Sequence, residues 1–68
     1  MSEINIKLNG ENRKIKRQTI SELISNLELD IKKIAIEKNL EIIDPDNFSE
    51  IYIEEGNRIE IVHFIGGG

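Results

Sequence analysis

The chain has 68 residues, no cysteine and a formal net charge of −4 at neutral pH. This length allows one small domain with little room for a deep enzyme cleft, and the lack of cysteine excludes disulfides, zinc ribbons and thiol nucleophiles. The acidic balance argues against nucleic acid as the main partner, no apolar run is long enough to span a membrane, and we therefore expect a cytoplasmic protein.

The N-terminal segment predicts a β-hairpin. Apolar and polar residues alternate over residues 3–8, which is typical of a strand with one buried face. Asn9 and Gly10 follow, and this dipeptide readily adopts the positive φ angles of a tight reversal. Residues 13–16 can then return as a second strand with Ile15 directed inward.

A helix is expected directly after the hairpin. Thr19 precedes Glu22 by three residues, which is the spacing of a capping box between a hydroxyl and a carboxylate. Apolar residues then recur at spacings of three and four, so that one stripe of the helix can cover a sheet. The members of this stripe are Ile20, Leu23, Ile24 and Leu27.

The middle of the chain predicts a third strand and a short partner. Residues 34–38 are rich in β-branched side chains, Asn39 suits a reversal, and residues 41–43 can pair with the strand before it. Pro45 follows an aspartate, which is typical of a single helical or 3₁₀ turn. Phe48 is the expected apolar anchor of that turn.

The C-terminal part predicts a turn and a long final strand. Ile51 and Ile53 are expected to extend the core, and a turn is expected at residues 55–57. The strand covers residues 58–65 in this prediction. Strand parity places its side chains on two opposite faces, with Ile59 and Ile61 on one and Val62 and Phe64 on the other.

The order of these elements favours an α+β protein. An antiparallel pair, a helix, a further strand and a central final strand form the order of the ubiquitin-like β-grasp fold. We therefore expect a mixed sheet of four to five strands wrapped around one main helix. Residues 1–65 form this domain in the prediction, and residues 66–68 form a flexible C-terminal glycine tail.

The tail is the most informative local feature. Gly66, Gly67 and Gly68 carry no Cβ atoms, so they contribute no packing and cost backbone entropy in any folded element. Such a thread fits a narrow active-site channel and leaves the last carbonyl carbon unhindered. Frayed termini are common, and the glycines alone leave that alternative open.

Three segments together resemble one family, and the resemblance covers nearly the whole chain. They are the helix start at 19–24, the strand and turn at 34–39, and the segment from Glu55 to Gly68. The chain is similar to the small sulfur carrier proteins of the ubiquitin-like group, most closely the ThiS family of thiamine thiazole synthesis. Asn57 departs from the pattern, because the family more often has an acidic residue in this turn.

The resemblance implies a carrier and not an enzyme. In the implied cycle, an E1-like adenylating enzyme uses ATP to activate the carboxylate of Gly68, and the adenylate is converted to a thiocarboxylate. A persulfide donor supplies the sulfur, and a thiazole synthase receives it. The chain itself would have no catalytic residue, no bound cofactor and no metal.

The end of the last strand is the expected docking surface for these partners. Val62, Phe64 and Ile65 can lie on the uncovered sheet face beside the tail, where a partner would bury apolar surface. The alternative is that these residues complete the core. His63 lies on the side of Ile59 and Ile61 by parity, and we expect it to be a partly buried structural residue.

Two charged clusters have simpler interpretations than binding sites. Four carboxylates do not match the spacing of a calcium loop and are expected to be solvated: Asp44, Asp46, Glu54 and Glu55. Four cations lie in or after the second predicted strand, where lysines commonly protect a sheet edge: Arg13, Lys14, Lys16 and Arg17.

Two other functions use the same fold and tail. One is the sulfur carrier that acts as the small subunit in molybdopterin synthesis, although such chains are usually longer. The other is a ubiquitin-like protein modifier or a non-covalent β-grasp interaction module.

Overall fold

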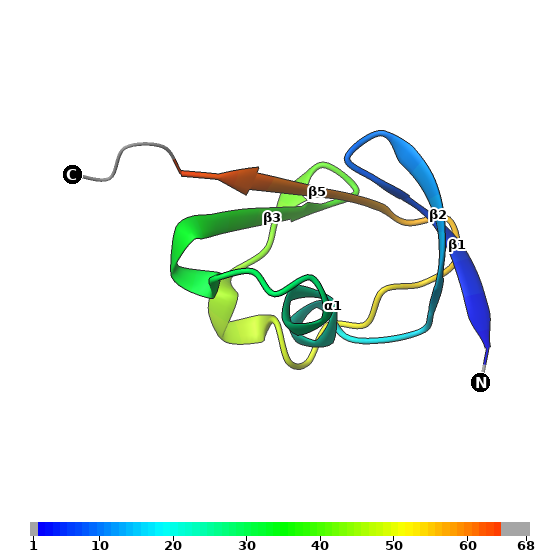
Figure 1. Cartoon of the computed structure of the whole chain (residues 1–68), viewed down its shortest axis with the longest axis horizontal. Coiled ribbons are helices and arrows are strands. Elements are labelled where there is room, and N and C mark those ends of the chain that lie inside the picture. Colours follow the sequence, from blue (N-terminus) through cyan, green and yellow to red (C-terminus); the bar gives the residue numbers. More distant parts are fainter. Residues whose placement is uncertain (1, 65–68) are drawn as a thin grey trace.

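The computed structural model describes residues 2–64 and contains one mixed sheet with one helix against it (Figure 1). The strand order is β2-β1-β5-β3-β4. β1 and β5 run parallel, and the other neighbouring strands run antiparallel. The elements are β1 (Glu3–Leu8), β2 (Glu11–Lys16), α1 (Ile20–Asn26), η1 (Ile31–Lys33), β3 (Ile34–Lys38), β4 (Glu41–Ile42), η2 (Pro45–Asn47) and β5 (Arg58–His63). This arrangement confirms the predicted α+β architecture with a central final strand.

The hairpin forms as its turn residues predict. Asn9 and Gly10 have φ angles of 51° and 83°, and they connect Leu8 to Glu11, which are paired in the register. Asparagine and glycine tolerate this left-handed region better than other residues do. β2 therefore begins at Glu11, earlier than the predicted start at residue 13, because the turn contains only two residues and pairing resumes directly after it.

The capping box at the start of α1 is confirmed. The backbone N–H of Glu22 donates to the Thr19 hydroxyl at 3.1 Å, and the Thr19 N–H donates to the Glu22 carboxylate at 2.8 Å. The helix ends at Asn26, however, and Glu28 adopts a positive φ of 57°. The prediction that Leu27 belongs to the buried stripe is wrong, because Leu27 is the C-cap and its side chain is 40% exposed.

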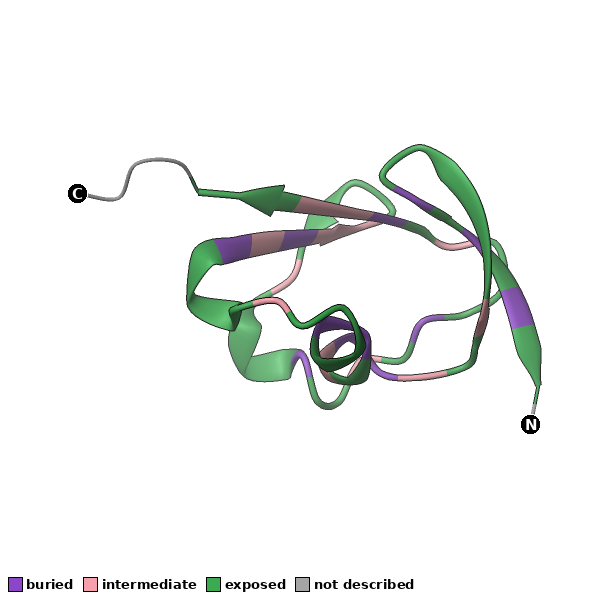
Figure 2. Ribbon diagram, viewed as in Figure 1, coloured by how far each residue is buried: buried purple, intermediate pink, exposed green. Residues whose placement is uncertain are grey.

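The core lies between the helix and the concave side of the sheet, where the buried positions of Figure 2 face one another. Phe48 is almost fully buried and anchors the segment after η2, as predicted. Full burial of one such apolar side chain contributes about 1.5–3 kcal/mol. The buried apolar residues are Ile4, Ile6, Leu8, Ile20, Leu23, Ile24, Ile34, Ile36, Phe48, Ile53 and Ile59. Ile15, Ile51 and Ile61 are partly buried against them.

The connections after β3 also follow local chemistry. Asn39 and Leu40 both have positive φ angles at the reversal into β4. The Asn39 side chain accepts a hydrogen bond from the Arg58 N–H at 2.9 Å, which ties this reversal to the start of β5. Asp44 caps η2 by accepting from the Asp46 N–H at 2.9 Å, and Pro45 occupies the first helical turn.

β5 is the central strand, but its two neighbours cover different lengths of it. β3 pairs with β5 from Lys38 opposite Ile59 to Ile34 opposite His63. β1 pairs with it only around Arg58 and Ile59. The strand ends at His63 and not at residue 65 as predicted, although the Phe64 N–H still donates to the Lys33 carbonyl at 2.9 Å. The predicted glycine tail at residues 66–68 and the docking residue Ile65 lie outside the described residues.

Among residues 2–64, no helix has the length and apolar character needed to cross a membrane.

Candidate functional site

The described part of the candidate site is the end of β5 and the surfaces on its two sides. The predicted sulfur attachment site Gly68, the tail residues Gly66 and Gly67, and Ile65 all follow it in the sequence and lie outside the described residues. What the structure places is therefore the strand that leads to them. In Figure 1, β5 runs beside β3 and points away from the β1–β2 hairpin.

Strand parity divides β5 into a covered and an uncovered face, as predicted. Ile59 is 0% exposed, and Ile61 is partly buried against the core. Val62 is 50% exposed and Phe64 is 60% exposed, so these two side chains do not complete the core. Their use in docking remains a prediction, but their exposure is the condition that docking requires.

The exposed apolar surface extends from β5 onto its neighbours. Val62 is paired with Ala35 of β3, and Ile42 of β4 is 75% exposed. Ile42 and Phe64 line one apolar hollow of about 510 Å³, together with Ile31 of η1. We call Ala35, Ile42, Val62 and Phe64 the outer apolar surface.

Ile42 was missed as a surface residue in the sequence analysis, although a signal was present. Ile42 and Ile43 are adjacent, and consecutive residues of an extended segment point to opposite sides. Only one of them can face the core. Ile43 packs against the core, and Ile42 therefore faces solvent.

The four carboxylates that were predicted to be solvated are all exposed, and those of Glu54 and Glu55 also make hydrogen bonds within the fold. Arg17 donates to both oxygens of Glu54 at 2.9 and 2.7 Å, and its guanidinium lies 4.3 Å from the centre of the Tyr52 ring. The hydrogen bond from Arg17 lowers the pKa of Glu54, and the same contact raises the pKa of Arg17. Glu55 accepts from the Asn5 N–H at 2.8 Å.

No group of three or more His, Asp or Glu side chains within residues 2–64 could hold a metal ion.

The basic cluster is divided between the two faces of β2. Arg13 is opposite Ile6, whose side chain is buried, and it pairs with Glu11 at 3.4 Å. Lys14 is exposed on the other face of this edge strand, and Lys16 is exposed at its end. This placement agrees with the predicted role of lysines in protecting a sheet edge.

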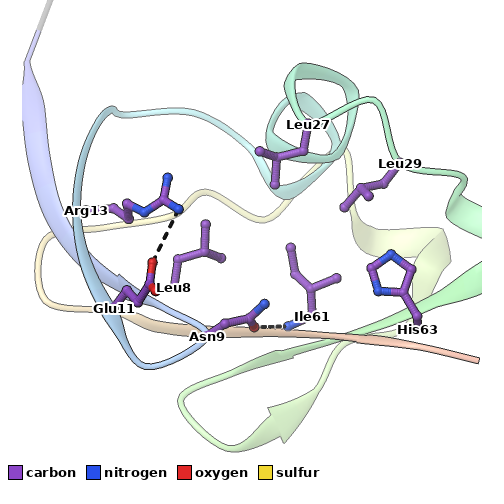
Figure 3. Close-up of a pocket in the computed structure, with 8 residues that line it drawn as sticks. All are labelled: Leu8, Asn9, Glu11, Arg13, Leu27, Leu29, Ile61 and His63. Atoms are coloured by element: carbon purple, nitrogen blue, oxygen red, sulfur yellow. Dashed lines mark hydrogen bonds and ion pairs between the residues drawn. The ribbon is translucent and has the colours of Figure 1, made fainter.

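His63 is exposed, so the prediction that it is partly buried is wrong. It lies on the same side as Ile61, as parity requires, but the neighbouring elements end before they cover it. His63 and Ile61 line a second hollow of about 370 Å³ between the hairpin and the end of α1. Figure 3 shows Leu27 and Leu29 facing Ile61 across this hollow.

Sequence comparison supports the resemblance over the same span. The sequence model of the ThiS family matches residues 6–68. The sulfur carrier protein ThiS of Bacillus subtilis is 38% identical over 65 residues, and the alignment covers 93% of this chain and 98% of that protein.

Two further relatives are longer proteins. The thiazole synthase of Paramagnetospirillum magneticum is 39% identical over 62 residues, and that of Magnetococcus marinus is 36% identical over 64 residues. This chain spans about a fifth of their length, with 19% and 20% of each protein covered.

A solved structure agrees with the fold. The crystal structure of the thiamine biosynthesis protein ThiS from Geobacter metallireducens matches with a TM-score of 0.83 and 25% identity, covering 96% of this chain and all of that one. The family match and the full-length relative from Bacillus subtilis together show that this chain belongs to the ThiS family of sulfur carrier proteins.

Proposed function

We propose that this chain carries sulfur for thiazole formation in thiamine biosynthesis as a thiocarboxylate on Gly68. The observation that supports this most directly is the family match, which continues through Gly68, together with the near-complete coverage of a relative named as a sulfur carrier. The sequence contains no cysteine, so no thiol of the chain competes as the attachment site.

The chemistry requires activation of the carboxylate by a partner. A carboxylate is a poor electrophile, because its negative charge repels nucleophiles. In the proposed first step, the Gly68 carboxylate attacks the α-phosphate of ATP on an E1-like adenylating enzyme, and pyrophosphate leaves. The sulfur of a persulfide donor then attacks the acyl carbon and AMP leaves. A thiol reduces the resulting acyl disulfide, which releases the thiocarboxylate.

The proposed receiving partner is a thiazole synthase. Two relatives named thiazole synthase contain a segment similar to this chain within a longer polypeptide. A domain that is fused to thiazole synthase in one organism is a reasonable binding partner of a separate thiazole synthase in another organism. The chain presents no catalytic group in this scheme, and its folded domain serves as the handle by which partners recognise the tail.

The outer apolar surface is the proposed docking site for these partners. Val62 lies near the end of β5, Phe64 directly follows the strand, and Ile42 extends the same exposed surface onto β4. Aromatic and aliphatic side chains of this kind supply much of the binding energy at protein interfaces. We include Ile65 in this surface on the basis of its position in the sequence.

The test is the intact mass of the chain after incubation with ATP, an adenylating enzyme and a persulfide donor. Replacement of one oxygen by sulfur adds about 16 Da, and this gain is the expected result for acyl-transfer chemistry at the terminus. An unchanged mass with enzymes that modify the Bacillus subtilis relative would contradict the proposal. Adducts on protein lysines would indicate a modifier, and transfer to a molybdopterin synthase would indicate the related carrier.

Deletion of Gly68 provides the matched control. We expect the deletion to abolish the mass gain while the free energy of unfolding changes by less than about 1 kcal/mol, because glycine contributes no side-chain packing. Urea denaturation measures the second quantity. A larger loss of stability would show that the terminus has a structural role.

A further inference from the structure

The two edges of β5 are used differently along the strand. Residues 58 and 64 direct their backbone groups to β3, since Asn39 N–H donates to the Arg58 carbonyl at 2.7 Å and Phe64 N–H donates to the Lys33 carbonyl at 2.9 Å. Ile59 faces β1, because its carbonyl accepts from the Asn9 N–H at 2.9 Å. Backbone groups alternate in this way along any strand, so the odd-numbered residues of β5 face the β1 side.

The β1 side becomes open after Ile61. The chain reverses at Asn9 and Gly10, and the pairing of β1 with β5 therefore stops. The Asn9 side chain accepts from the Ile61 N–H at 2.8 Å and ends this ladder. By alternation, the Ile61 carbonyl and the His63 N–H point to the same side, where the described residues provide no further strand. We call residues 61–63 the open edge of β5.

The hollow of about 370 Å³ lies beside this open edge. Leu8, Leu27 and Leu29 line it with Ile61, and Arg13 and His63 lie on opposite sides of it (Figure 3). Leu27 is 40% exposed because α1 ends before it can cover this part of the sheet. A strand added to the open edge would direct alternate side chains toward the hollow, where an apolar residue would find apolar contacts.

We propose that an extended segment of thiazole synthase pairs with the open edge of β5 and places an apolar side chain in this hollow. The inference rests on the proposed function, and it specifies how the partner holds the carrier. The relatives that contain a similar domain within a thiazole synthase chain support this choice of partner. Pairing at residues 61–63 would also orient the strand that leads directly to Gly68.

The outer edge of β2 differs from the open edge of β5 in the side chains that surround it. Asn5 directs its backbone groups toward the β5 side, because the Gly56 N–H donates to its carbonyl at 2.7 Å. Lys14 of β2 is paired with Asn5 in the register. The Lys14 N–H therefore points away from β1, toward the outer edge of the sheet. Lys14 and Lys16 are exposed there, and such lysines oppose strand addition. The open edge of β5 carries no lysine.

A pair of substitutions at one position tests the backbone contact. His63→Pro removes the N–H that faces the open edge and leaves the hydrogen bonds to β3 unchanged, whereas His63→Ala keeps the N–H and removes only the side chain. We expect His63→Pro to bind thiazole synthase about tenfold more weakly than His63→Ala, because both variants lack the imidazole and only proline also lacks the backbone N–H. Equal melting temperatures of the two variants would show that the domain remains folded.

Amide hydrogen exchange tests the same contact without a substitution. In the complex with thiazole synthase, exchange at the His63 amide should slow by about tenfold or more, while exchange at the Lys14 amide on β2 should be unchanged. This measurement decides the question if His63→Pro does not fold. Slowing that appears with increasing concentration of the carrier alone would assign the edge to a second copy and would overturn the proposal.

The two proposals fail in different ways. If the original chain neither gains sulfur nor binds thiazole synthase, the proposed function is wrong. If it gains sulfur and binds, but the His63 amide exchanges as in the free chain and the two His63 variants bind equally, only the pairing at the open edge is wrong.

Discussion

The two faces of β5 differ in what covers them, although they belong to the same short strand. On the inner face, Ile59 is 0% exposed and packs in the core beneath α1. On the outer face, Val62 and Phe64 are exposed beside Ala35 and Ile42. The inner face stabilises the fold, and the outer face is the one that we propose for docking. In a domain this small, alternation along one strand separates the residues that stabilise the fold from those that are exposed to solvent.

The largest expected effect breaks the inner face. Ile59→Ala should lower the free energy of unfolding by about 2–5 kcal/mol, because it removes buried methyl groups and leaves a cavity. The matched change on the outer face, Phe64→Ala, should alter it by no more than about 0.5 kcal/mol, since an exposed side chain loses few contacts. Urea denaturation of both variants measures the difference.

A large loss of stability in Phe64→Ala would contradict the division between the two faces. Binding to a partner should show the reverse pattern, with an effect of the outer residue. Phe64→Ala should weaken binding to thiazole synthase by about 1–2 kcal/mol if the outer apolar surface is the docking site.

The second prediction concerns the cap that holds α1 over the inner face. Thr19→Ala removes the hydroxyl that accepts from the Glu22 N–H, and it should lower the free energy of unfolding by about 0.5–2 kcal/mol. Thr19→Ser keeps the acceptor and is the control. If alanine and serine have equal effects, the packing of the Thr19 methyl group, and not the cap, supports the helix.

The smallest effect is expected from the exposed pair of Arg17 and Glu54. The pKa of Glu54 is lowered in the folded protein by the hydrogen bond from Arg17, so this pair stabilises the fold above the usual glutamate pKa of 4.5. The contribution is lost as the pH falls through the lowered value. Melting temperatures of the original chain and of Glu54→Gln should therefore differ slightly at pH 7 and converge on acidification.

Persistence of that difference at low pH would show that Glu54 acts through packing and not through its charge. The pair lies on the surface, where solvent screens the interaction, and this is why the effect should be smaller than that of the cap.

Much of the fold could be predicted because its signals are local. The alternation over residues 3–8, the turn at Asn9 and Gly10, and the capping box of Thr19 each depend on residues that are neighbours in the sequence. Strand parity alone also placed Val62 and Phe64 on the opposite face of β5 from Ile59. The exposure of Leu27 and of His63 was not predicted. The periodicity of a sequence indicates the side to which a side chain points, but it does not show whether another element covers that side chain.

The sequence by itself determined the hairpin, the start of the helix and the side on which each residue of β5 lies, since these depend on local chemistry and chain order. Only the tertiary structure decided which of those sides is covered. β1 reverses at Asn9 and α1 ends at Asn26, so both stop before they reach the end of β5. The open edge and its apolar hollow exist because elements distant in sequence are too short to fill the space between them.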